Sequence, residues 1–356
     1  MDSDLPSQLL TALSDSVTAP TATSTVATAT ATAILHTATA LATAVTNASA
    51  TASRPSFVLN YAKVVRWSSV EAAYIFMAVA LLMGFATLRN LIYGAKSSHT
   101  RFVYAVLMAW CVFRTGGFAV RGYILTDDHG QDMTLYKWAA ILGNVGFMPL
   151  AQVLAFCALE GTALAYGFPE KTMKRSDLLV RLLFGIFGTT VMAFAIDYTC
   201  NKPFGSNVKD YTVDLVLREI GFNGLILITV VSLLGSVANI RAVVPQGKVP
   251  AVFVPRFRMM MIVVCFQSVL MLIKLVFTTY RNWNPFELRD EVIWYVLSIA
   301  PEYLLMLCYM NHGFLKVYDD IERYTLDLEE EQAKAKEVPA DSEEAVTHVD
   351  DVAAVA

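Results

Sequence analysis

Charged residues are scarce in this sequence of 356 residues. Asp, Glu, Lys and Arg make up 16% of it, whereas hydrophobic residues make up 56%, and the mean hydropathy is +0.50. A soluble chain of this length cannot bury so much apolar surface in one or two cores. The composition therefore excludes an ordinary soluble domain and indicates an integral membrane protein. The net charge of −4 includes an acidic C-terminal tail and gives no reason to expect a nucleic-acid partner.

Cysteine and histidine are also rare. Four of the five cysteines lie in apolar runs and only Cys200 lies in a polar segment, so no disulfide framework is expected. No apolar run carries the His and carboxylate set that an intramembrane zinc hydrolase needs. The chain also has no P-loop, no G-x-S-x-G and no dinucleotide-binding fingerprint. We therefore expect no catalytic residue, no metal and no cofactor, and we do not expect an enzyme.

Long apolar runs dominate the rest of the chain. Seven of them are each about long enough for the ~20 residues that cross a bilayer. They are 70–93, 102–125, 136–166, 178–199, 213–240, 257–280 and 291–314. The S-x-x-E pattern from Ser68 to Glu71 predicts a capping box at the start of the first. The predicted fold class is all-α, a polytopic membrane bundle of seven transmembrane helices.

The basic residues of the short loops predict the orientation of the bundle. Loops one, three and five are the more basic ones: Arg89, Lys96 and Arg101; Lys171, Lys174, Arg175 and Arg181; Arg241, Lys248, Arg256 and Arg258. Lys63 and Arg66, beside the first span, oppose this trend. The balance places loops one, three and five inside, so the N-terminus is predicted to lie outside and the C-terminus inside.

The segments at the two ends differ from the spans in composition. Residues 1–67 are rich in Ser, Thr and Ala, which predicts a disordered extracellular stalk with an N-glycosylation sequon at Asn47 and no cleaved signal peptide. Residues 68–316 form the predicted seven-transmembrane domain. Residues 317–356 are predicted to form a cytoplasmic amphipathic helix and an acidic disordered tail. The helix is indicated by apolar residues at helical spacing, namely Phe314, Val317, Ile321, Tyr324 and Leu328.

Two arginines interrupt the second apolar run, in the stretch FRTGGFAVRGY. Arg114 and Arg121 are seven residues apart and therefore project from the same face of a helix. An arginine near the bilayer centre costs on the order of 2.5 kcal/mol or more. We expect Arg114 to face the bundle interior and to have a partner. We expect Arg121 to lie near the outer interface, where its side chain can reach water.

Polar residues recur on helix faces of other spans at a similar estimated depth. They are Asn144, Gln152, Asp197, Glu219, Asn223, Gln267, Lys274 and Glu302. Ionisable residues inside a membrane mark ligand or substrate paths by default. We therefore predict that these residues, with Arg114 and Arg121, line a polar cavity that opens outward. Arg114 with Glu302 is the first predicted ion pair and Lys274 with Glu219 the second. The alternative is that such pairs only fix the register of the helices.

Several stretches resemble those of fungal seven-span membrane proteins. They are TLRNLIYGAKSSHTR, FRTGGFAVR, AAILGNVGFMPLAQVLAF, FTTYRNWNP and YVLSIAPEYLLMLCY. The resemblance covers about residues 66–316 and is to an uncharacterised group of family-C-like G-protein-coupled receptors. The chain is more loosely similar to the fungal lipid-translocating exporter family.

The resemblance implies a receptor-like protein, which we expect in the plasma membrane. A small or lipidic ligand would bind in the outward-facing cavity, and residues 241–258 and 314–330 would contact a cytoplasmic signalling partner. An exporter or flippase-like transporter of lipids and amphiphiles, conferring resistance to membrane-active compounds, is the alternative. A structural organiser of a membrane domain, with no small ligand, is the third possibility.

Overall fold

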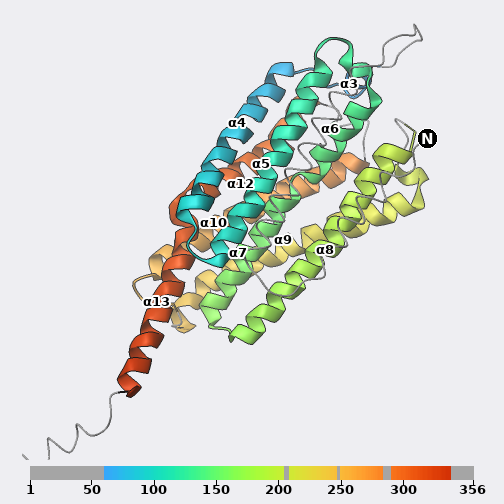
Figure 1. The fold of residues 1–356 in the computed structure, drawn as a ribbon. Coiled ribbons are helices and arrows are strands. Elements are labelled where there is room, and N and C mark those ends of the chain that lie inside the picture. The colour runs from blue at the N-terminus through green and yellow to red at the C-terminus, as the bar shows by residue number, and fades with distance from the viewer. Residues whose placement is uncertain (1–59, 204–207, 247–248, 284–289, 338–356) are drawn as a thin grey trace, which may run out of the picture. The chain divides into compact units, whose positions relative to one another are not determined.

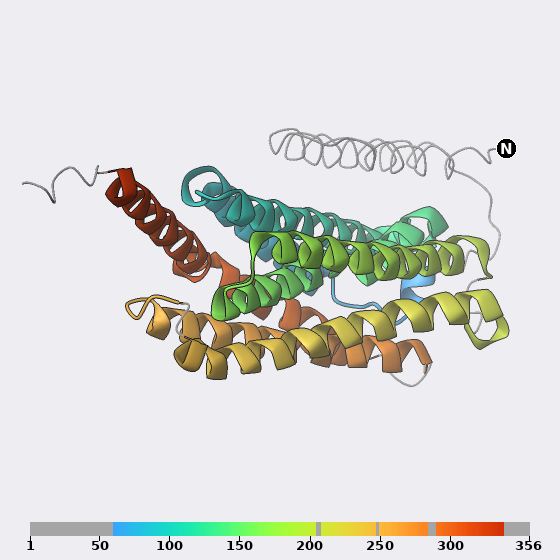
Figure 2. The same ribbon diagram turned by 90° about the horizontal axis from the view of Figure 1, so that it is seen from below.

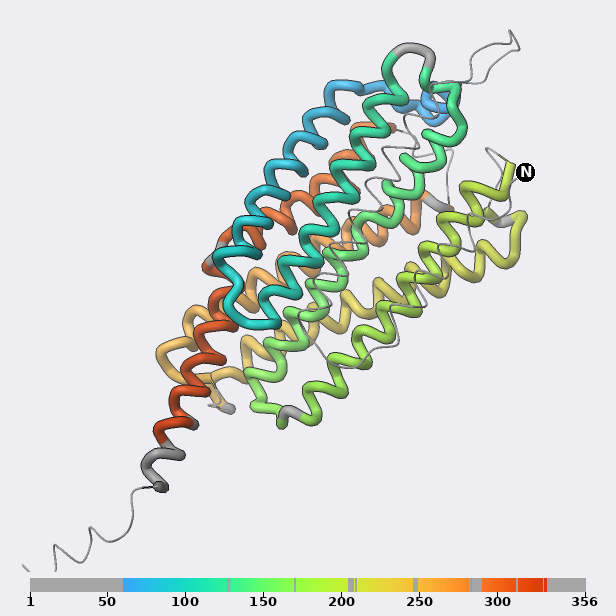
Figure 3. Tube along the Cα trace, viewed as in Figure 1, coloured from blue at the N-terminus to red at the C-terminus, as the bar shows by residue number. Residues whose placement is uncertain are grey.

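The computed structural model describes residues 60–203, 208–246, 249–283 and 290–337, and the chain can be followed through them in Figures 1 and 3. These residues are mostly helical and include no strand. Most of the predicted stalk, Asn47 and the acidic end of the tail lie outside the described residues.

Seven segments of the described residues are long and apolar enough to cross a membrane. The first four are α4 (Val70–Arg89) with its π-helical end η1 (Asn90–Gly94), α5 (Ser98–Leu125), α6 (Met133–Val145) with α7 (Met148–Tyr166), and α8 (Glu170–Asn201). The other three are α9 (Thr212–Gln246), α10 (Val254–Trp283), and α11 (Glu291–Trp294) with the π-helical η4 (Tyr295–Ile299) and α12 (Ala300–Met310). The predicted all-α, seven-span fold is confirmed.

Four other elements of the described residues flank the spans. They are α3 (Tyr61–Val64), the 3₁₀ turns η2 (Asp127–Gln131) and η3 (Val208–Asp210), and α13 (His312–Glu337). We call the end of the bundle that carries α3, η2 and η3 the Glu291 end. The end where α13 begins is called the Asp319 end. The sequence predicts that the Glu291 end faces the outside of the cell, and this orientation stays a prediction.

Several predicted boundaries differ from the observed ones by a few residues, and two of these differences have a clear cause. The fourth helix begins at Glu170 rather than near 178, because a basic turn continues the helix beyond its apolar part. The seventh span ends at Met310 rather than 314, since Asn311 leaves helical geometry with ψ near 103°. Hydropathy locates the apolar part of a helix, whereas backbone hydrogen bonds determine where the helix ends.

The predicted capping box at the start of α4 is wrong. The N-cap is Ser69, whose hydroxyl accepts a hydrogen bond from the Ala72 amide at 3.1 Å. Ser68 instead donates its amide and its hydroxyl to Glu291 Oε2, at 2.7 and 2.8 Å. Ser68, which the sequence predicts to cap α4, therefore binds a carboxylate of the seventh span instead.

The packing of the spans determines which side chains are buried. Neighbouring pairs in Figures 1 and 2 include α4 with α5, α7 with α9, α8 with α9, and α9 with α10. The third span is the most buried and the fourth the least. Apolar side chains such as Leu82, Leu178 and Leu234 remain exposed on the outer helix faces. In a bilayer these side chains contact lipid.

Two spans are interrupted near their middle. In the third span, α6 ends at Val145 and α7 begins at Met148, with Pro149 in its first turn. In the seventh span, η4 precedes Pro301 in the first turn of α12. Proline has no N–H and leaves a carbonyl one turn earlier without its helical partner. Within a membrane such irregular backbone is stable only where it is enclosed by protein or lines a cavity.

The helix α13 lies where the apolar spacing predicts an amphipathic helix. Phe314, Val317 and Ile321 are buried at the Asp319 end of the bundle, whereas Tyr324 and Leu328 are exposed. Figure 2 shows α13 continuing past the ends of the spanning helices. Its first half is therefore part of the folded bundle, and the residues that follow, from Glu322 to Leu328, are exposed.

Candidate functional site

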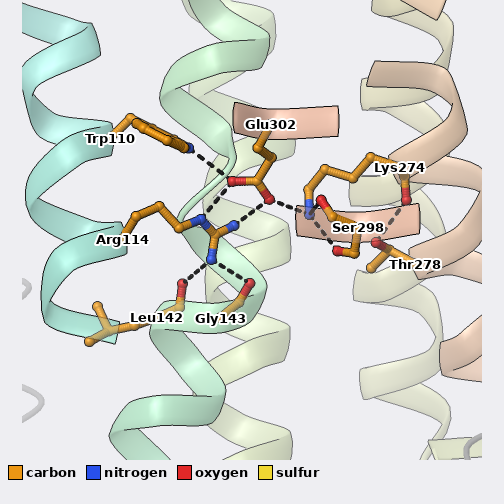
Figure 4. Close-up of polar contacts among 8 residues, drawn as sticks. All are labelled: Trp110, Arg114, Leu142, Gly143, Lys274, Thr278, Ser298 and Glu302. Atoms are coloured by element: carbon orange, nitrogen blue, oxygen red, sulfur yellow. Dashed lines mark hydrogen bonds and ion pairs between the residues drawn. The ribbon is translucent and has the colours of Figure 1, made fainter. Parts of the chain in front are cut away.

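Glu302 lies at the centre of a buried polar cluster and has no exposed surface. Its Oε2 accepts hydrogen bonds from Trp110 Nε1 at 2.9 Å and Arg114 Nε at 2.6 Å. Its Oε1 lies 2.5 Å from both Arg114 Nη2 and Lys274 Nζ. Figure 4 shows the carboxylate between the two cations, which come from different helices. Both oxygens of this carboxylate are fully occupied by protein donors.

Arg114 binds Glu302 through two parallel hydrogen bonds, and the first predicted ion pair is confirmed. Its remaining nitrogen, Nη1, donates to the carbonyls of Leu142 and Gly143 at 3.4 and 3.2 Å. These carbonyls lie in the last turn of α6, which carries the partial negative charge of a helix C-terminus. A Cβ at Gly146 would lie 3.1 Å from the guanidinium carbon of Arg114. The small residue therefore lets the arginine approach the end of α6.

Lys274 shares Glu302 with Arg114, so the predicted pair of Lys274 with Glu219 is wrong. The ammonium group donates to Ser298 Oγ at 2.8 Å and to the Ser298 carbonyl at 3.4 Å. It also lies 4.9 Å from the ring centroid of Phe147, a cation–π distance. Ser298 belongs to the π-helical η4, so each cation of the cluster bonds to backbone at one of the two interrupted spans.

The cluster has two cations and one carboxylate, which gives it a formal charge of +1. Arg114, Lys274 and Glu302 are only 2%, 1% and 0% exposed. Ions taken out of water are stable only when well paired and hydrogen bonded. Here the carbonyls of Leu142, Gly143 and Ser298 supply the negative potential that the single carboxylate does not. In this conformation the cluster is closed, whereas the sequence predicts that these residues line an open cavity.

Arg121 is enclosed by protein, and the prediction that its side chain reaches water is wrong. It is 5% exposed, and its Nη2 donates to Glu291 Oε1 at 2.6 Å. Its guanidinium carbon lies 4.4 Å from the Trp67 ring centroid and 4.3 Å from that of Trp294. The other oxygen of Glu291 binds Ser68 and Ser69. This second cluster joins α5, the start of α4 and the start of the seventh span.

Glu219 and Asn223 belong to a third cluster, on α9. Asn223 donates to Glu219 Oε2 at 2.8 Å, and the other Glu219 oxygen lies 2.5 Å from Arg218 Nη2. Arg218 is 1% exposed and its guanidinium carbon lies 4.2 Å from the Trp283 ring centroid. Arg218 is not among the residues that the sequence predicts for the site.

The other predicted site residues are dispersed. Asp197, at the Glu291 end, pairs with Lys202 at 3.1 Å, and this hydrogen bond raises the pKa of the lysine. Gln267 is fully buried and lies 3.5 Å from the Leu305 carbonyl. Asn144 and Gln152 are half-buried. The ten predicted residues are therefore divided among separate clusters along the bundle.

A further polar contact joins α13 to the bundle at the Asp319 end. Asp319 accepts hydrogen bonds from the hydroxyls of Ser97, at 2.6 Å, and Thr100. Tyr318 donates its hydroxyl to the Cys157 carbonyl at 2.7 Å, and burial holds the pKa of this phenol well above its usual range. The phenol therefore stays neutral and remains a donor. Asp319 and Ser97 together fix α13 at the N-terminus of α5.

Three residues of these clusters are not among the site residues that the sequence predicts. Trp110 is an indole in an apolar run, and no periodic signal separates a hydrogen-bonded tryptophan from one that only packs. Glu291 is the first residue of the last predicted apolar run and was given no role in the site. Ser298 shares a helix face with Glu302, and that spacing was a usable signal.

Comparison with family models, curated proteins and solved structures finds no match. Among the described residues, no group of three or more His, Cys, Asp or Glu side chains is placed to hold a metal ion. The site is therefore characterised by its own geometry. It is a closed, charged cluster that connects four helices at the points where two of the spans are irregular.

Proposed function

We propose that the chain is a receptor-like membrane protein in which the Arg114–Lys274–Glu302 cluster holds one of two helix arrangements. The observation that carries this proposal is the sharing of one buried carboxylate between cations on α5 and α10. A small or lipidic ligand acting at the Glu291 end would shift the equilibrium between the two arrangements.

The interrupted helices support a switching role. The cations bond to carbonyls at the end of α6 and in η4, so a change in either segment alters their hydrogen bonds. Buried ionic contacts of this kind have few alternative geometries, because an unpaired ion in a membrane is costly. Packed interiors therefore move between discrete arrangements rather than deforming continuously.

The expected signalling surface lies at the Asp319 end. It consists of the basic segment 241–258 and the helical segment 314–330, which contact each other where the Phe253 and Tyr324 rings lie 5.7 Å apart. A rearrangement of α10, which carries Lys274, would move this surface directly, since α10 packs against α13.

An exporter of lipids or amphiphiles is the second candidate. The observation that favours it is the pair of interrupted spans meeting at a charged site, an arrangement also used by secondary transporters. Such a protein would open the closed cluster alternately toward each side of the membrane.

One experiment separates the two candidates. Cells lacking the protein, cells with the wild type and cells with a Lys274→Met variant would be treated with a membrane-active amphiphile carrying a fluorescent label. A receptor should change the transcriptional response to the amphiphile while leaving its cellular content unaltered. An exporter should lower the content directly, and the variant should reverse that effect.

Deletion of the second half of α13, residues 322–337, tests the receptor proposal further. The response should be lost although the amount of protein at the membrane is unchanged. A full response from this deletion and from charge reversal at Arg256 and Arg258 would contradict the proposal, because no cytoplasmic contact surface would then be required.

A further inference from the structure

A groove lies beside α4 at the Glu291 end, outside the predicted site residues. It has a volume of about 540 Å³, within the range of small-ligand pockets. Its walls are the start of α4, from Ser68 to Phe76, and the first two turns of the seventh span, from Asp290 to Val296. The Glu291 hydrogen bonds to Ser68 and Ser69 join these two walls. Deeper in the bundle, the Tyr303 hydroxyl donates to the Phe76 carbonyl at 2.7 Å.

One side of the groove opens toward lipid. Val292 and Val296, which line it, are 67% and 57% exposed on a membrane-spanning segment. The lining is also aromatic, because Phe76 of α4 and Tyr295 of the seventh span stack with ring centroids 4.9 Å apart. An acyl chain can therefore enter from the bilayer and lie against this stack without crossing water.

The rim of the groove carries one available charge of each sign. Arg66 is exposed and forms no ion pair with the described residues. Asp290 is also exposed, and its Oδ1 only caps the amide of Val292. The third charged lining residue, Glu291, is already paired with Arg121 and hydrogen bonded to the two serines. A ligand with a cationic and an anionic group complements this rim, whereas a ligand with a single charge leaves one rim residue unmatched.

We propose that this groove binds a zwitterionic single-chain phospholipid drawn from the surrounding membrane. Its phosphate would face Arg66, its ammonium group would face Asp290, and its chain would lie along Phe76 and Val296. This rests on the proposed function and names the ligand class and the binding site for it.

The groove is placed to act on the buried cluster. Tyr295 and Val296 are the first two residues of the π-helical η4, and Ser298 of the same segment binds Lys274. Single-turn π segments are often found at functional sites. A chain inserted against Tyr295 would favour one geometry of η4 and thereby one set of contacts for Lys274.

The test measures binding of fluorescent lysophosphatidylcholine to the purified full-length protein in nanodiscs. Its anionic competitor is a lysophosphatidylglycerol of the same chain length, and its cationic competitor is an alkyltrimethylammonium. The wild type should prefer the zwitterionic probe by about tenfold or more. Equal binding of the three head groups would overturn the proposal, since it would indicate simple partition into the lipid shell.

Matched variants locate the binding site. Val296→Trp fills the groove and should weaken binding by about tenfold or more. Val231→Trp is the control, since Val231 is 59% exposed on α9 and does not line the groove. Equal effects of the two tryptophans would overturn the site. Asp290→Asn keeps a side chain that can cap the helix, and it should weaken the preference for the zwitterionic probe over the anionic lipid. Arg66→Gln should weaken the preference for the zwitterionic probe over the cationic amphiphile.

This assay distinguishes failure of the ligand site from failure of the proposed function. It reads binding alone, so a protein without a signalling output can still bind the probe in the groove. Conversely, a receptor response that persists in the Val296→Trp variant would retain the proposed function and reject this groove as its ligand site.

Discussion

At the scale of single residues, Glu302 determines the electrostatics of the bundle interior. It accepts hydrogen bonds from Trp110, Arg114 and Lys274, which lie on two other helices. Because two cations depend on one carboxylate, the three side chains are not equivalent. Removing the carboxylate leaves two buried cations facing each other, whereas removing Lys274 leaves a neutral pair.

The Glu302→Gln substitution should therefore lower the free energy of unfolding by about 3–5 kcal/mol, as expected for a broken buried pair. Lys274→Met should cost less, because Arg114 and Glu302 still pair in its absence. Thermal unfolding of the purified protein in detergent measures both. Asp177→Asn, which breaks the exposed pair with Arg181, is the control and should change the stability by about 0–1 kcal/mol. A Lys274 variant less stable than the Glu302 variant would contradict this charge assignment.

Arg121→Ala should also be strongly destabilising, by about 3 kcal/mol or more, since Glu291 would lose its buried partner. Arg121→Lys should recover part of this loss, because an ammonium restores the charge but not the flat contact with Trp67 and Trp294. Tryptophan fluorescence during thermal unfolding reports both variants. Arg66→Ala is the matched control at an exposed arginine. Indistinguishable melting of the Ala variants at 66 and 121 would contradict the enclosed position of Arg121.

At the scale of helices, close approach of α8 and α9 depends on glycine. A Cβ added at Gly224 would meet the Phe187 ring, and one added at Gly221 would lie 2.5 Å from Val191 Cγ2. Small residues allow helix backbones to approach within a membrane, where packing contributes much of the association energy. The least buried span is therefore held by contacts that larger residues would prevent.

Gly224→Ala should destabilise the protein although alanine favours a helix over glycine by about 1 kcal/mol. Gly185→Ala is the matched control in α8, because nothing lies within 4 Å of a Cβ at that position. This control should be neutral or stabilising in the same thermal unfolding measurement. Equal shifts of the two melting temperatures would show that α8 and α9 are not in close contact there.

At the scale of the whole molecule, the orientation in the membrane is a prediction from the loop charges and has a direct test. Cys200 is the exposed cysteine at the Glu291 end, whereas Cys111 and Cys157 are buried. A membrane-impermeant maleimide should therefore label the wild type on intact cells. The Cys200→Ser variant gives the background.

The complementary variant carries Ser98→Cys in the Cys200→Ser background. Ser98 is exposed at the Asp319 end, so labelling should require permeabilised cells. The reverse pattern would place the N-terminus inside and assign the groove to the cytoplasmic leaflet.

Much of the fold could be predicted from the chain alone. Apolar runs of span length gave the seven helices, and the cost of a buried arginine gave the partnership of Arg114 with Glu302. The position of Arg121 could not be predicted, because Trp67 and Trp294 reach it only through the packing of other segments. It could not be predicted either that the polar residues expected to line one cavity are divided among separate clusters.

The sequence by itself determined that seven helices are long and apolar enough to cross a membrane, since this follows from counting apolar residues along the chain. Only the tertiary structure decided which charges meet. That depends on the rotation of each helix about its axis and on the breaks near Gly146 and in η4, which are fixed by packing against neighbouring helices. Lys274 binds Glu302 rather than Glu219 for this reason.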